Sequence, residues 1–123
     1  QWDDHEVTNN WFPGQILDDA HYRERRVDVL FPRARQAFHE YLPIRPCPEE
    51  PGRVYRNFAF GPLAEVFLLD ERSYRGTNNN NRQPQMSPDA AFMGAAQLNW
   101  FKQKLSESKA TWKIISSDMP IGL

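Results

Sequence analysis

The chain has 123 residues, which is enough for one domain with a modest core and too few for a second independent core. Hydrophobic residues make up 40% of it and charged residues 25%, values that are ordinary for a globular protein and exclude a disordered tail. With a net charge of -1, the chain lacks a global field that would draw it onto nucleic acid or an anionic membrane. Cys47 is the only cysteine, so an intrachain disulfide is impossible, and no apolar run approaches the roughly 20 residues of a membrane span.

The first third of the chain predicts a loop followed by helical segments. Residues 1–15 show no periodicity and contain a Pro-Gly pair, which indicates an ordered loop that follows a strand end. Residues 18–30 carry acidic side chains first and arginines later, an order that suits the helix dipole and predicts a helix. We expect Pro32 to end or restart this helix. Apolar residues between 34 and 41 then repeat at helical spacing.

The middle of the chain predicts a connector and a β-hairpin. Residues 43–52 contain four prolines, which indicates a stiff connector over the surface. Residues 54–60 alternate in polarity and residues 64–69 resume after a Gly-Pro pair, so we expect two paired strands. The second strand is apolar except for Glu65, which predicts burial on both faces. It ends in Asp70, and the end of a buried strand is a favourable place for a functional carboxylate.

The last third predicts a loop, a helix and a strand. Residues 71–90 are polar and include four consecutive asparagines from Asn78, so we expect a long flexible loop with a disordered tip. The apolar stripe of residues 91–105 predicts an amphipathic helix, and residues 110–116 predict a strand. Because the chain has neither an initiating Met nor a leader, we expect the natural N-terminus to lie elsewhere.

The run Asp3-Asp4-His5-Glu6 is the strongest chemical signal in the sequence. It places three carboxylates and an imidazole within four residues, and Asn9 and Asn10 follow it. Carboxylate and amide oxygens suit a hard cation, and a neighbouring histidine can pass a proton to a leaving group. The alternative is that these residues form turns and helix caps, with His5 merely exposed. Spacing alone leaves both interpretations open.

A resemblance favours the first interpretation. The string Trp2-Asp3-Asp4-His5-Glu6-Val7-Thr8-Asn9-Asn10-Trp11 resembles the signature of the alkaline phosphatase D (PhoD-like) phosphoesterases, a branch of the calcineurin-like metallophosphatases. Further blocks follow in that family's order. They are Gly52-Arg53-Val54-Tyr55-Arg56, Leu69-Asp70-Glu71-Arg72-Ser73-Tyr74-Arg75, Gly94-Ala95-Ala96-Gln97-Leu98-Asn99-Trp100-Phe101, and Ala110-Thr111-Trp112-Lys113-Ile114-Ile115 with Asp118-Met119-Pro120.

The resemblance implies a fold and a reaction. The fold class is α+β, and the chain corresponds to part of a four-layer α/β/β/α metallophosphatase sandwich. We expect residues 1–123 to form a single incomplete segment of the catalytic domain, because the family's opening and closing metal motifs do not occur in them. The implied cofactor is a divalent or mixed metal pair, with calcium and iron favoured. The implied reaction is hydrolysis of phosphate mono- or diesters through in-line attack by a metal-bound hydroxide.

The resemblance also assigns roles to residues of the first block. Asp4 corresponds to a metal ligand and His5 to the histidine beside the substrate phosphate, where it protonates the leaving oxygen or stabilises the transition state. Asp3 or Glu6 is expected to orient the His5 ring from outside the metal's coordination sphere.

Four further residues complete the predicted site. Asn9 and Asn10 can each supply an amide oxygen to the metal or a donor to the phosphate, and we assign Asn9 to the metal and Asn10 to the substrate. Arg72 is a candidate phosphate clamp because a guanidinium suits bidentate phosphate recognition. Asp70 is expected to support the site from outside the metal's coordination sphere. The alternative for Arg72 is a structural pair with Asp70 that ties the strand end to the loop.

The predicted partners are a phosphate ester and the remaining segments of the parent enzyme, with no membrane and no specific nucleic acid. The family resemblance also favours a secreted or periplasmic location. The alternative function is a catalytically inactive fragment that acts as a binding or scaffold module.

Overall fold

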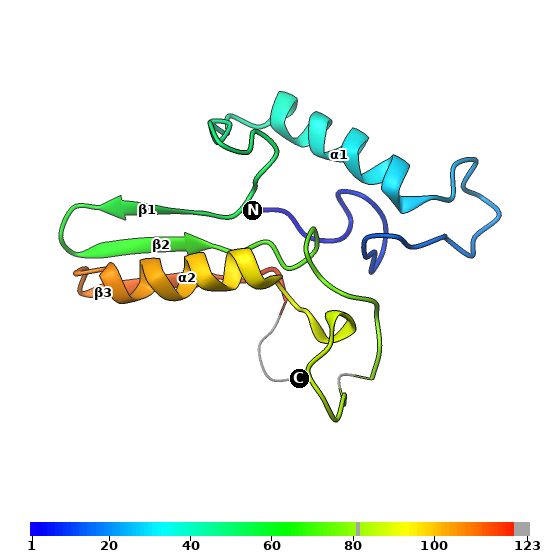
Figure 1. Ribbon diagram of the computed structural model, residues 1–123. Helices are drawn as coiled ribbons and strands as arrows, with labels where there is room; N and C mark the ends of the chain where they lie inside the picture. Colours follow the sequence, from blue (N-terminus) through cyan, green and yellow to red (C-terminus); the bar gives the residue numbers. More distant parts are fainter. Residues whose placement is uncertain (81, 120–123) are drawn as a thin grey trace.

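The computed structural model describes residues 1–80 and 82–119. The elements in these ranges are α1 (Val27–Tyr41), β1 (Arg56–Phe60), β2 (Ala64–Leu68), the short 3-10 helix η1 (Pro88–Ala90), α2 (Ala95–Glu107) and β3 (Trp112–Ser116). The predicted α+β class is confirmed. In Figure 1, α2 runs along the sheet, whereas α1 lies on the far side of the N-terminal segment. No helix of the described part is long and apolar enough to cross a membrane.

The three strands form one sheet in the order β1-β2-β3. β1 and β2 pair antiparallel as the predicted hairpin, and Gly61 supplies the positive φ of 61° that the turn between them requires. β2 and β3 pair parallel, with α2 as the crossover. Leu68 is opposite Ser116 in the register, so the carboxyl ends of β2 and β3 lie side by side.

Helix α2 covers one face of the sheet. On that face Phe67 is fully buried, and its ring centroid lies 5.9 Å from that of Phe101. The prediction that β2 is buried on both faces is wrong, because no element of the described chain packs on its other face and Val66 and Leu68 stay partly exposed. Large apolar side chains of the neighbouring strands share this open face. They are Phe58, Phe60, Trp112 and Ile114.

A second apolar cluster anchors the N-terminal loop to α1. Trp2 and Trp11 are 1% and 0% exposed, and their rings meet edge to face with centroids 5.9 Å apart. Phe31 and Phe38 of α1 pack on Trp2 at 5.6 and 5.4 Å. Each aromatic pair of this kind adds about 0.5–1.5 kcal/mol to the burial of its area. The loop that carries the acidic run is therefore fixed by the two tryptophans that flank it.

The predicted helix over residues 18–30 is wrong at its start. Residues 18–26 form a loop whose ends are closed by backbone pairing: the Leu17 N–H donates to the Arg25 carbonyl at 2.8 Å, and Ile16 bridges Arg26. The Arg25 carbonyl is thereby used by Leu17 and is not free to accept a hydrogen bond within a helix over residues 18–30. Helix α1 then continues through Pro32, which was expected to end or restart it. The aromatic packing of α1 on the N-terminal loop offsets the hydrogen bond that Pro32 removes.

The remaining boundaries differ from prediction by a few residues. Helix α2 begins at Ala95 instead of 91, because Gly94 has a φ of 71° and cannot continue a helix on its N-terminal side. The connector over residues 43–52 is confirmed as irregular. Residues 71–80 and 82–90 are loop apart from η1, and the side chain of Asn78 donates to the Asn10 carbonyl at 2.7 Å. The predicted disordered tip falls partly on residue 81, outside the described residues.

Candidate active site

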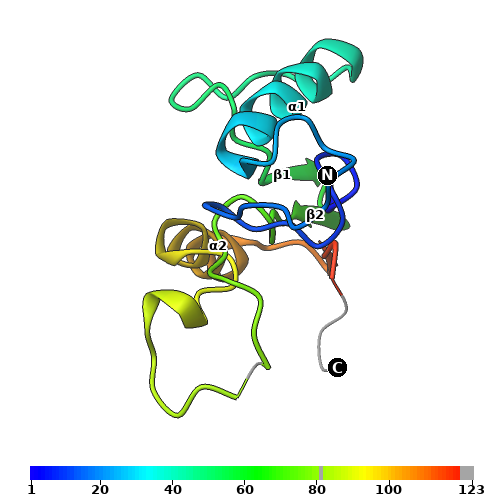
Figure 2. The same ribbon diagram turned by 90° about the vertical axis from the view of Figure 1, so that its right-hand side faces the viewer.

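Three segments that are far apart in sequence meet beyond the carboxyl ends of β2 and β3. They are the N-terminal loop, the turn at residues 70–73 after β2, and residues 116–118 at the end of β3. Contacts between them join positions up to 115 residues apart, including a bond from the Ser116 hydroxyl to the Gln1 side chain. In Figure 2 the blue N-terminal segment lies beside the sheet. Ligands of open α/β sheets bind outside the carboxyl ends of parallel strands, so this region is the candidate active site.

Asp4, the predicted metal ligand, is 5% exposed. Its backbone carbonyl accepts the N–H groups of Val7 and Thr8, both at 2.9 Å, which closes a tight turn. Its Oδ2 accepts the Asn10 N–H at 2.7 Å. Burial by itself would raise the pKa of Asp4, but the Asn10 N–H and the charge of Arg72 outweigh it and hold the pKa below its usual value. Asp4 is therefore held as a carboxylate.

His5, the predicted catalytic residue, is open to solvent beside Asp4. Its side chain is 78% exposed, and its Nδ1 lies 3.2 Å from Asp4 Oδ1. The carboxylate in contact with the ring is thus that of Asp4, instead of Asp3 or Glu6 as expected. Glu6 instead accepts the Asp3 N–H at 2.7 Å and closes the loop. Asn9 is exposed, and its role at a metal stays a prediction.

Arg72 joins the three segments. It is 4% exposed, and its Nε donates to Asp3 Oδ1 at 3.1 Å. Its guanidinium also lies 3.9 Å from the Asp4 carboxylate and 3.7 Å from that of Asp118. Asp70 and Arg72 are also linked, as the structural alternative expected, but through the backbone N–H of Arg72 at 3.2 Å and not through its guanidinium. Its contact with a phosphate stays a prediction, as does that of Asn10.

Asp70 shapes the turn that carries Arg72. Its Oδ1 accepts the backbone N–H groups of Arg72 at 3.2 Å and Ser73 at 2.9 Å, and its Oδ2 accepts the Ser73 hydroxyl at 2.6 Å. Aspartate favours such a turn because its short side chain reaches the backbone two and three residues ahead. The Asp70 side chain therefore holds the backbone of Arg72, and its supporting role at a metal or substrate stays a prediction.

Two acidic side chains of this region were not predicted as site residues. Glu71 is 1% exposed, and its Oε2 accepts the Ser117 hydroxyl at 2.6 Å and the Met119 N–H at 3.1 Å. The side chain of Asp118 is 1% exposed, and its Oδ1 accepts the Glu71 N–H at 3.3 Å. Burial is the main cause, and a hydrogen bond with Glu71 the second, that raises the pKa of Asp118 to about 7. Its place after a strand, like that of Asp70, was the signal that could have indicated it.

The described residues do not fit the predicted calcium and iron pair on their own. Among residues 1–80 and 82–119, no group of three or more His, Cys, Asp or Glu side chains lies close enough to hold a metal ion. Asp4 has one oxygen engaged by a backbone N–H and the guanidinium of Arg72 nearby, and a fixed cation disfavours a second cation at short range. Asp4 and Asn9 supply one edge of such a centre at most.

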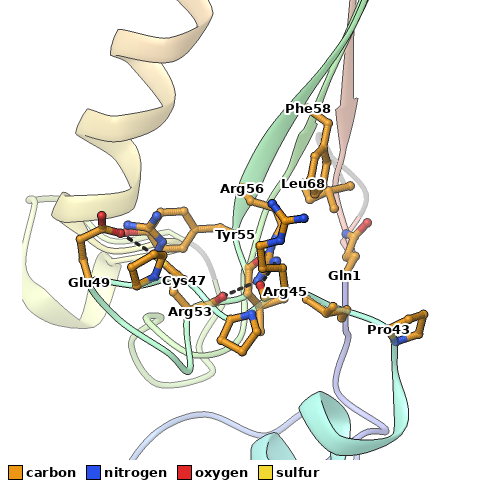
Figure 3. Close-up of a pocket in the computed structure, with 14 residues that line it drawn as sticks. Gln1, Pro43, Arg45, Cys47, Glu49, Arg53, Tyr55, Arg56, Phe58 and Leu68 are labelled. Atoms are coloured by element: carbon orange, nitrogen blue, oxygen red, sulfur yellow. Dashed lines mark hydrogen bonds between the residues drawn. The ribbon is translucent and has the colours of Figure 1, made fainter.

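A cavity of about 790 Å³ lies elsewhere in the chain. Figure 3 shows it between the proline-rich connector and strands β1 and β2. Arg56 crosses it and donates to the carbonyls of Val54, Arg45 and Arg53 at 2.9, 2.7 and 2.7 Å, which fastens the connector to β1. None of the predicted site residues lines this cavity. The candidate active site is therefore a polar surface at the strand ends, not a deep pocket of the described chain.

Charged groups gather at the carboxyl ends of the parallel strands β2 and β3, where Arg72 lies buried among the carboxylates of Asp3, Asp4 and Asp118. This is the end of an open α/β sheet at which ligands bind. Comparison with known proteins specifies the class. The profile of the family described as "PhoD-like phosphatase" matches residues 1–123. The chain is 32% identical over 127 aligned positions to alkaline phosphatase D of Bacillus subtilis (strain 168), an alignment that covers 96% of the chain and 21% of the relative.

A solved structure agrees with this comparison. The structure titled "Structure of PhoD" superposes with a TM-score of 0.67 at 30% identity, over 94% of this chain and 23% of that one. The chain belongs to the PhoD-like phosphatase family. It spans about a fifth of the length of the curated relative that it matches.

Proposed function

We propose that this chain contributes the His5 edge of a site that hydrolyses phosphate mono- or diesters. The observation that carries the proposal is the placement of Arg72, which is buried and fixed between the acidic run of the N-terminal loop and Asp118. This contact joins three of the blocks that resemble the family into one site at the ends of β2 and β3. Phosphoryl chemistry depends largely on positioned charge, which such a site provides.

In the proposed reaction, His5 carries the proton step. The ring is exposed enough to reach a substrate, and its Nδ1 lies against the Asp4 carboxylate. In the protonated ring each nitrogen carries a proton, so Nε2 can donate its proton to the leaving oxygen while the proton on Nδ1 stays against Asp4. Arg72 has one guanidinium nitrogen, Nη1, buried and without a hydrogen-bond partner within the described chain. A phosphate oxygen is a suitable acceptor for it. Asn10 can add a further amide donor from the loop.

Metal dependence forms part of the proposal. A metal pair would neutralise phosphate charge and activate water, with Asp4 and Asn9 as the contribution of this chain and the other ligands from outside the described residues. Which metals bind, with calcium and iron favoured by family resemblance, stays a prediction. Export of the parent protein to the periplasm or the medium stays a prediction as well.

The experiment uses the protein expressed from its complete gene. Purified wild type, Asp4→Asn and Asp4→Ala are assayed for release of nitrophenol from mono- and bis-nitrophenyl phosphate, before and after dialysis against a chelator. We expect hydrolysis of at least one ester, its loss on chelation, and a loss of roughly 100-fold or more in both variants, since each removes a charged ligand oxygen. Elemental analysis of the same samples reports the bound metals.

Two results would contradict the proposal. One is a folded wild-type protein that hydrolyses neither ester after metals are supplied. The other is full activity in both Asp4 variants. In the first case the remaining candidate is the non-enzymatic one, a binding or scaffold module, for which the described chain offers no particular observation. In the second case the protein hydrolyses phosphoesters, but without the contribution assigned to Asp4.

A further inference from the structure

Gln97 is buried in a manner that is unusual for its residue type. It lies in the first turn of α2 and is 1% exposed, whereas glutamine is mostly found at protein surfaces. Its side-chain amide holds both backbone polar groups of Asp70: Oε1 accepts the Asp70 N–H at 2.8 Å, and Nε2 donates to the Asp70 carbonyl at 2.7 Å. The same Nε2 donates to the Met93 carbonyl at 2.9 Å. One side chain thus ties the start of α2 to the end of β2.

The position of Asp70 explains what this amide does. Leu69 makes the last backbone bond to the neighbouring strand, with its N–H on the Ser116 carbonyl at 3.0 Å. Asp70 is 1% exposed, so its backbone groups need partners at the point where sheet pairing ends. Gln97 replaces the missing strand neighbour by offering one acceptor and one donor.

The two hydrogen bonds between Gln97 and the Asp70 backbone, here called the Gln97 clamp, are linked to the candidate active site through few contacts. The Asp70 carboxylate accepts the backbone N–H of Arg72 at 3.2 Å. The Arg72 guanidinium then contacts Asp3 at 3.0 Å and lies within 4 Å of the Asp4 and Asp118 carboxylates. A shift of the Asp70 backbone therefore moves the guanidinium, because only one residue separates the two.

We propose that Gln97 is a positioning residue of the phosphoesterase site: it fixes the backbone of Asp70 and so places the guanidinium of Arg72. This inference rests on the proposed function for its link to the reaction. Gln97 itself touches neither the acidic run nor any place where a substrate would bind. An apolar residue of the same length would fill the space but leave both backbone groups of Asp70 unpaired, and the turn would shift to find other partners.

The test compares Gln97→Met with Gln103→Met in the protein expressed from its complete gene. Gln103 is a matched control, because it lies on the same helix with its amide bonded to the exposed Glu107 at 2.7 Å. For Gln97→Met we expect kcat/KM on bis-nitrophenyl phosphate to fall about 10- to 100-fold, as a displacement near 1 Å can cause. We also expect faster amide hydrogen exchange over residues 70–73. Gln103→Met should match wild type in both measurements.

A double-mutant comparison separates positioning from a general loss of stability. If Gln97 acts through Arg72, then Gln97→Met should cost little further activity in an Arg72→Met background. The inference is overturned if Gln97→Met costs the same factor in both backgrounds, or if exchange over residues 70–73 equals that of wild type. If Gln97→Met fails to fold, Gln97→Glu is used in its place. The glutamate keeps an acceptor for the Asp70 N–H but loses the donor to the Asp70 carbonyl, so amide exchange over residues 70–73 should rise in a folded protein. Unchanged exchange in that variant would refute the Gln97 clamp.

The exchange measurement does not depend on catalysis. If the wild-type protein hydrolyses no phosphoester, the proposed function fails, while exchange over residues 70–73 still decides whether Gln97 holds the Arg72 turn. If the protein is active and exchange is unchanged in Gln97→Met, the positioning inference fails and the proposed function stands.

Discussion

Replacing Arg72 by Met should destabilise the protein strongly. The contact with Asp3, at 3.0 Å, contributes little, because that carboxylate is 47% exposed and water can replace the guanidinium. The carboxylates of Asp4 and Asp118 are only 7% and 1% exposed, so they lose their cation without gaining water. Removing one partner of buried charges costs about 3–5 kcal/mol. Because the pKa of Asp118 is raised to about 7, part of its charge is absent near neutral pH, and we expect about 3 kcal/mol.

The measurement is the free energy of unfolding from urea titrations of the protein expressed from its complete gene. Lys104→Met is the control: it removes a cation from a surface pair with Glu107, whose side chains are 39% and 51% exposed. We expect that variant to stay close to wild type, since such pairs are well solvated. Equal stability of Arg72→Met and Lys104→Met would refute the interpretation of Arg72 as the buried cation that holds the acidic segments together.

Two further predictions concern pH and packing. Because folding raises the pKa of Asp118 from 3.8 to about 7, the stability it contributes is complete below about pH 4 and is lost as the pH rises through about 7. Asp118→Asn should therefore flatten the dependence of the melting temperature on pH between about pH 4 and 7. Asp4 does not interfere, because its pKa is lowered and it titrates below this interval. An unchanged slope of melting temperature against pH would contradict the assignment to Asp118. Phe67→Ala should cost about 3–5 kcal/mol in urea unfolding, since the ring is fully buried under α2. Tyr41→Ala, at a side chain 86% exposed, should cost far less, and equal losses would contradict the packing described.

The hairpin and α2 were predicted correctly because residues close in sequence determine them. The hairpin followed from alternation around a glycine turn, and α2 from its apolar stripe, with an error of four residues where Gly94 imposes a positive φ. Helix α1 was misplaced because its start depends on pairing between Leu17 and Arg25 across a loop. Its passage through Pro32 depends on aromatic packing against the N-terminal loop. Neither contact is visible in a window of neighbouring residues.

The contacts within the candidate site could not be predicted from the sequence, although several of its residues could be named from it. The acidic run and Arg72 were identified from motif resemblance, and the structure brings them together across 69 positions. The burial of Asp118 against Glu71, 47 residues away, could not be predicted from either residue alone. Gln97 falls in the predicted amphipathic helix of residues 91–105, but its burial could not be predicted, because a polar residue gives no sequence signal of a buried partner such as the Asp70 backbone.

The central claim is that His5 carries a proton step in phosphoester hydrolysis, and one comparison tests it most directly. His5 and His21 are both exposed, and each has its Nδ1 against a neighbouring aspartate, at 3.2 and 2.7 Å. In the protein expressed from its complete gene, His5→Ala should lower kcat/KM on bis-nitrophenyl phosphate by roughly 100-fold or more. His21→Ala should leave it unchanged. Equal rates in the two variants would contradict the account.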